Sequence, residues 1–159
     1  MDLLDRLLGH DHWATDQLLV LSQGLTDAQL DQPFDIGHRT LRDTFEHMIF
    51  NVEAWTAVMA GQPVDIQRDD HSLAALSERD ERSHAAFVAL ARRVRDEQRL
   101  DDTFVDHYDA HMTFGGAILM VILHNAEHRT EALHILERLG VPDLPEVDHG
   151  LWDFRRRGF

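Results

Sequence analysis

The sequence contains no cysteine. This absence excludes disulfide bonds, thiolate nucleophiles and thiolate metal ligands, and it agrees with a reducing compartment. Any metal site in the chain must therefore use nitrogen or oxygen ligands.

Basic residues and long apolar runs are also scarce. The chain has 15 Lys and Arg against 29 Asp and Glu, a formal net charge of -14, so most of its surface repels phosphate backbones. No apolar run approaches the roughly 20 residues of a membrane-spanning helix, and the acidic segment Met1–Arg6 does not resemble a signal peptide. We expect a cytoplasmic protein that binds neither nucleic acid nor membrane, with Arg155–Arg157 as a solvated tail.

Length and composition predict one globular domain over residues 1–159. The chain is 43% hydrophobic and 8% aromatic, within the ordinary range for folded proteins. A domain of this length buries about two-thirds of its unfolded surface. Neither a disordered nor a fibrous class is favoured.

Apolar residues recur at spacings of three and four, which predicts an all-α, up-and-down four-helix bundle. Thr40 and Ser72 are suited to cap two of the helices, and Gly140 with Pro142 ends the last. Helices are predicted over residues 2–24, 40–59, 72–99 and 113–139. Residues 25–39 indicate a loop with a short turn at 27–30, residues 101–111 a loop or a short extended piece, and residues 143–159 coil.

The strongest chemical signal is a histidine pair near the centre of the last predicted helix. His124 and His128 are four residues apart, so they share one face and can chelate one ion. The same row contains Val121 and Ile135, which indicates that the pair is buried. The alternative is two neutral core histidines that hydrogen-bond to their neighbours.

His47, in a polar row of the second predicted long helix, supplies a third nitrogen ligand. One histidine from one helix and a pair from another can meet inside a bundle. Three imidazoles leave a coordination position open for water, as in catalytic sites. We therefore predict one divalent metal ion, zinc or nickel, at His47, His124 and His128.

Residues 124–128 also spell His-x-x-Glu-His, an inverted zinc-protease signature with Glu127 as general base. Too few residues follow His128 to provide the further ligand and substrate-binding body of such an enzyme, so the protease interpretation is rejected.

Most of the remaining histidines are expected at the surface or in helix packing. His10 and His12 are expected at the surface or in helix packing, with one as a possible pocket group, and His107 with His111 is only a weak second metal site. Trp13, Trp55 and Met59 are expected in the core. Surface positions are predicted for His38, His71, His84, His134 and His149.

Several of these residues carry a resemblance to a known family. They are Trp13-Ala14, His47 and Trp55, and His124-x3-His128-Arg129 in a helix that ends at Leu139-Gly140. The chain resembles the DinB/YfiT-like superfamily over nearly its whole length. This resemblance implies a four-helix bundle, a homodimer, and nickel or zinc held by three histidines that match His47, His124 and His128.

The chain departs from the family pattern after Arg129. Many members have Gly followed by Gln there, whereas this sequence has Thr130-Glu131. Glu131 could orient an imidazole, accept a proton from bound water as a catalytic residue, or be an ordinary surface acid.

The resemblance implies two reaction classes for a small-molecule substrate. One is a metal-dependent hydrolase; the other is an S-transferase or isomerase that uses a low-molecular-weight thiol. An anionic thiol cofactor would need basic residues, and only Arg42 and Arg129 lie near the three histidines in sequence. The alternative to an enzyme is a non-catalytic, stress-related protein that binds a metal or a small ligand. A DNA-damage protein is disfavoured by charge.

Overall fold

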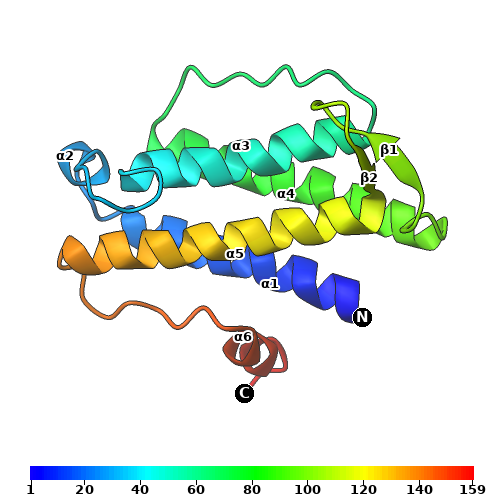
Figure 1. Cartoon of the computed structure of the whole chain (residues 1–159). Helices are drawn as coiled ribbons and strands as arrows, with labels where there is room; N and C mark the ends of the chain where they lie inside the picture. Colours follow the sequence, from blue (N-terminus) through cyan, green and yellow to red (C-terminus); the bar gives the residue numbers. More distant parts are fainter.

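The structure, a computed structural model that describes all 159 residues, confirms the all-α prediction. Four long helices form the body of the molecule (Figure 1). Their bounds are Leu3–Ser22 for α1, Leu41–Met59 for α3, Leu73–Asp96 for α4 and Phe114–Arg138 for α5. The short elements are helices α2 (Asp27–Leu30) and α6 (His149–Arg156) and the antiparallel strands β1 (Thr103–Val105) and β2 (His111–Thr113).

The long helices begin where capping side chains allow them to begin. Thr40 accepts a hydrogen bond from the backbone of Asp43, and Ser72 accepts one from Ala75. Each bond satisfies an amide at the helix start that has no partner within the helix. Both caps were predicted from the sequence. Helix α5 ends before Gly140, whose φ of +76° suits glycine best.

The bundle places α1 diagonally opposite α3. Helices α4 and α5 each pack against both α1 and α3. Linker 60–72 runs back over the length of α3, so α3 and α4 point the same way (Figure 1). The 19 residues of α3 span about 28 Å as a helix, a distance that the linker covers easily at about 3.3 Å per extended residue. Long helices that follow one another in the chain therefore do not all run in opposite directions.

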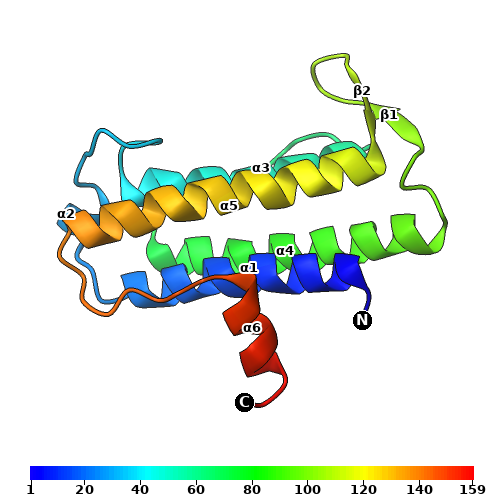
Figure 2. The ribbon, with the colours of Figure 1, turned by 60° about the horizontal axis from the view of Figure 1, so that its bottom comes forward.

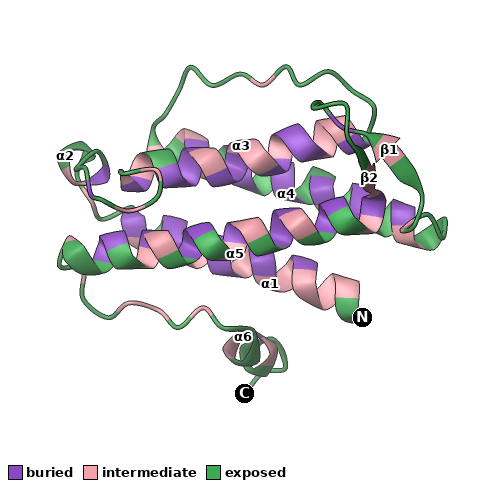
Figure 3. Cartoon of the chain, in the orientation of Figure 1, coloured by how far each residue is buried: buried purple, intermediate pink, exposed green.

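Buried residues lie along all four long helices (Figure 3). Two apolar clusters fill the bundle on either side of a polar layer. One cluster centres on Trp55, Phe87 and Val121, and the other on Phe45, Leu76 and Ile135. Trp55 and Met59 are buried, as predicted, whereas Trp13 is only half-buried.

An ion pair in the polar layer joins α1 to α5. Arg129 donates to Asp11 at 2.5 Å, and both side chains are almost fully buried. Asn125, one turn before Arg129, also donates to Asp11, at 3.2 Å. The pair closes one side of the bundle around a polar contact.

A second buried group joins α3 to α4. Arg79 donates to Glu46 at 2.7 Å and to Glu53 at 2.6 Å. Two carboxylates around one guanidinium satisfy its donors in a fixed geometry, so α4 is held against the same helix that carries His47.

Helix α6 contradicts the prediction of coil for residues 143–159. Asp148 caps it by accepting from Leu151, and Trp152 is buried against Gly9 of α1. Figure 2 shows α6 beside α1 with its axis across the bundle. The helix is stabilised by tertiary packing, which its short and punctuated sequence does not reveal. Arg155–Arg157 are exposed, as predicted, but lie at the end of this helix.

His84 is a second correction, because it is buried rather than at the surface. Its ring stacks on that of His12, with centroids 4.2 Å apart. Burial, followed by the charges of His12 and Arg92, lowers the pKa of His84 to about 3. His71, His134 and His149 are exposed, as predicted.

None of the helices combines the length and apolar character needed to cross a bilayer.

The buried ion pair predicts a large effect of Asp11→Ala. Removing the carboxylate leaves the Arg129 guanidinium buried without its partner, which should lower the free energy of unfolding by about 3–5 kcal/mol. The control is Arg92→Ala, which breaks the more exposed pair with Asp5 and should cost at most about 1 kcal/mol. Urea unfolding measures both, and equal losses would contradict the role given to Asp11.

His84 predicts a pH dependence of stability. Because its folded pKa is lowered from 6.5 to about 3, folding favours the neutral ring, and the stability it contributes is complete above pH 6.5 and is lost as the pH falls toward 3. His84→Gln should therefore lose about 1–2 kcal/mol less than the parent between pH 7.5 and 5. Urea unfolding at both pH values tests this, with exposed His134→Gln as control. Identical pH slopes in parent and His84→Gln would refute it.

Candidate metal centre

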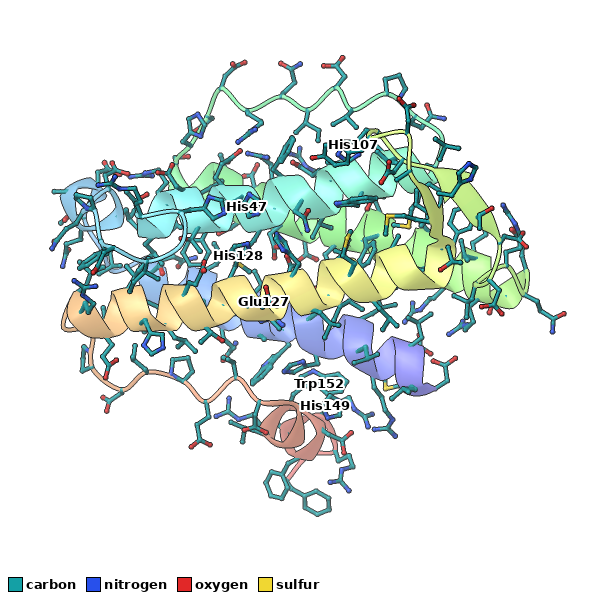
Figure 4. All side chains as sticks on the ribbon, viewed as in Figure 1. His47, His107, Glu127, His128, His149 and Trp152 are labelled. Carbon is teal, nitrogen blue, oxygen red and sulfur yellow. The ribbon has the colours of Figure 1, made fainter.

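The three histidines predicted as ligands come together between α3 and α5. Nε2 of His47 lies 2.8 Å from Nε2 of His124, which lies 3.1 Å from Nε2 of His128. The ring centroids of His47 and His128 are 4.7 Å apart. Figure 4 shows His47 on α3 facing His128 on α5. Helix spacing places the α5 pair on one face, and packing of α3 on α5 brings His47 to it.

A fourth histidine, His38, joins this cluster, so its predicted surface position is wrong. Its ring stacks on His47 with centroids 3.8 Å apart and lies 5.0 Å from the ring of His128. One nitrogen from each of His38, His47 and His128 lies within 4.8 Å of the others. His38 belongs to the loop before α3, where no helical periodicity signals a shared face. Two possible sets of three nitrogens thus share His47 and His128.

Glu131 holds the ring of His128. The two side chains meet at 2.6 Å between Nδ1 and Oε2, and an ionised carboxylate can only accept, so Nδ1 carries the hydrogen. The lone pair of the neutral ring is then on Nε2, the atom that faces His124. Of the three roles considered for Glu131, this contact matches that of an orienting acceptor.

The environment favours the neutral form of three rings in the cluster, those of His38, His47 and His124. Burial, with smaller effects from His38, His128 and His124, lowers the pKa of His47 to about 4. Burial is also the largest cause that lowers the pKa of His124 and of His38. Near pH 7 these rings have lone pairs to offer a cation.

The donor set fits a divalent ion of the zinc or nickel type. Tetrahedral Zn–N bonds of about 2.0–2.1 Å place ligand nitrogens about 3.3 Å apart. The observed separations of 2.8 and 3.1 Å require the rings to move apart by only a few tenths of an ångström. All-nitrogen ligation is also what a chain without cysteine can provide.

Gly37 lets the loop before α3 pass against Glu131. Its φ is +43°, and a Cβ at this position would overlap the Glu131 carboxylate. Only glycine combines this backbone angle with the required space. The loop and the carboxylate that orients His128 are therefore built against each other.

A solvent-open cavity of about 330 Å³ borders the histidines. Its lining includes His38, His47, Phe50 and Arg68. The Arg68 guanidinium lies 4.3 Å from the centre of the Phe50 ring and donates through Nε to Glu46 at 2.5 Å. Asn51, one helical turn after His47, has a buried side-chain nitrogen with no hydrogen-bond partner.

The other candidate residues lie away from this centre. His107 and His111 are exposed at the β-hairpin and His107 lies against Trp55, so the pair does not join a metal-binding group. His10 contacts the carbonyl oxygen of Val147 at 2.8 Å, and Glu127 is exposed on α5.

The two arginines that seemed available for an anionic cofactor are both occupied. Arg129 is buried with Asp11, and Arg42 bonds to Asp27, Asp31 and the carbonyl oxygen of His71. The basic residue that does border the cavity is Arg68. Sequence reasoning missed it because it lies in the linker between α3 and α4.

The Glu131–His128 contact predicts that Glu131→Ala weakens metal binding. Without its acceptor the His128 ring loses both its orientation and its fixed tautomer, so zinc affinity should fall about 10–100-fold. Competition with a chromogenic chelator measures the affinity. Glu127→Ala, which removes an exposed acid next to His128, is the matched control. If the two variants bind zinc equally well, Glu131 has no orienting role.

Comparison with known proteins identifies a family for the chain. No curated protein matches the chain. The sequence model described as the DinB superfamily matches residues 10–132, most of the chain, including α3 and the part of α5 that carries His124 and His128. The match gives a family and leaves the reaction open. The chain belongs to the DinB superfamily.

Proposed function

We propose that this protein is a metal-dependent enzyme that acts on a small molecule, with one divalent ion, zinc or nickel, held by His47, His124 and His128. The observation that carries the proposal is that Nε2 of His124 lies 2.8 Å from Nε2 of His47 and 3.1 Å from Nε2 of His128. Imidazole nitrogens that lie this close together have few hydrogens with which to bond to one another. A bound cation would be coordinated by the lone pairs of all three rings at once.

Such an ion, when bound, would lower the pKa of a bound water or thiol and so supply a nucleophile near neutral pH. The protein's own residues prepare the site. Glu131 fixes the ring of His128, and the packing of α3 on α5 fixes His47 against His124.

The size and lining of the cavity suit a small substrate. Its volume of about 330 Å³ lies at the lower end of small-molecule sites. Phe50 provides an apolar wall and Arg68 a cationic one. We favour hydrolysis over thiol transfer, because Arg42 and Arg129 are paired with carboxylates, and Arg68, the one arginine at the cavity, is itself paired with Glu46.

The second candidate function is non-catalytic binding of a metal or small ligand in a stress response. The exposed approach to His47 through the cavity favours the enzyme, because a purely structural metal site is normally closed by four protein ligands. Turnover of a substrate that depends on the metal would decide between the two.

Metal analysis tests the proposal directly. Purified protein, stripped with a chelator and reloaded with zinc or nickel, should contain about one ion per chain. His47→Ala and His128→Ala should lose it, because these residues belong to both possible ligand sets. His134→Ala, an exposed histidine on α5, should bind like the parent.

The result of the metal analysis also decides which assays of activity follow. A parent protein that holds no ion after reloading would overturn the proposal. One ion per chain, lost in both variants, would support it and justify a screen of ester, amide and thiol-transfer substrates with the loaded protein. Loaded protein inactive across that screen would favour the binding-protein alternative.

A further inference from the structure

His38 is held in place differently from the other histidines of the cluster. It lies on the loop between α2 and α3, whereas His47, His124 and His128 are carried by packed helices. Neither of its ring nitrogens makes a hydrogen bond to the protein, while His128 is held by Glu131. Its ring nevertheless stays half-buried, stacked on His47.

The loop is shaped to bring His38 to this position. Gly37 and Arg39, its two neighbours, both have positive φ values, of +43° and +73°. The turn is closed by Phe34 N–H donating to Arg39 O and Arg39 N–H donating to Ile36 O, each at 2.7 Å. A left-handed conformation is uncommon for a residue with a Cβ, and such strain concentrates at functional sites. Two bends around one histidine therefore point to a role for its side chain.

That side chain has an electron pair to offer and no partner to receive it. One nitrogen of His38 lies within 4.8 Å of nitrogens of both His47 and His128, so a modest rotation of its side chain brings it to the same centre. His38 also lines the cavity through which a substrate would approach. His38 thus borders both the histidine cluster and the cavity.

We propose that His38 is a fourth, exchangeable nitrogen ligand, which completes the coordination of the resting metal site and leaves it when a substrate or other ligand enters from the cavity. The inference rests on the proposed metal site. His128 is fixed by Glu131, whereas the ring of His38 is held only by its stack on His47 and can turn about its own side-chain bonds. His38 therefore protects the ion in the absence of substrate.

The competing explanation is that His38 only packs on His47. His38→Phe separates the two, because phenylalanine keeps an aromatic face against His47 but offers no nitrogen. His38→Ala removes both the stack and the ligand, and His134→Ala is the control for loss of an exposed histidine. Circular dichroism checks that each variant is folded before metal is added.

Cobalt(II) is a suitable probe, because its visible absorption reports the number and type of its ligands. In His38→Phe and His38→Ala the spectrum should change in the same way, and cobalt should bind about tenfold more weakly than in the parent. Azide, added to cobalt-loaded protein, should bind more tightly to both variants than to the parent, because His38 no longer competes with it for a coordination position.

The outcomes separate this inference from the proposed function. A parent that binds no cobalt overturns both. A parent that binds cobalt, with a spectrum and azide affinity unchanged in His38→Phe, overturns the role of His38 and leaves the three-histidine site standing. Changes in His38→Ala that His38→Phe does not share would assign His38 to packing alone.

Discussion

The buried ion pair between Arg129 and Asp11 fixes which way α5 faces. Arg129 and Asn125 turn one face of α5 toward α1, where both bond to Asp11. Residues on the neighbouring face, His124 and His128, must then point toward α3. Separating buried charges costs several kcal/mol, so α5 cannot rotate freely about its axis. The position of the histidine pair depends on a contact that none of the histidines makes.

A polar layer across the bundle serves the same purpose on α3. Glu46 and Glu53 bind Arg79 of α4, and His47 lies on α3 between these two acids in sequence. The layer separates two apolar clusters that stabilise the bundle on either side of it. Buried polar groups of this kind add little net stability but define helix register. The α3 residue of the histidine cluster, His47, thus directly follows an acid that ties α3 to α4.

Much of this arrangement could be predicted from local sequence signals. Caps at Thr40 and Ser72 and the periodicity of apolar residues predict the long helices, because these signals act within a few residues. The i, i+4 spacing predicts that His124 and His128 share a face. The stripe on α3 places His47 near the core margin, and the structure shows it meeting the α5 pair.

Other features depend on contacts between distant segments. His38 reaches the cluster through a loop bent at Gly37 and Arg39, and Trp152 orders α6 only because Gly9 leaves room for it. His84 is buried by a stack with His12 across two helices. The occupation of Arg42 and Arg129 likewise follows from tertiary packing. No spacing rule within one segment carries this information.

The proposed function requires a metal ion held between α3 and α5. An anomalous-difference map from a crystal of zinc-loaded protein, recorded at the zinc absorption edge, tests it most directly. One peak within bonding distance of nitrogens from both His47 and His128 is the predicted result. A peak elsewhere, or none at the cluster in protein shown to contain zinc, would contradict it.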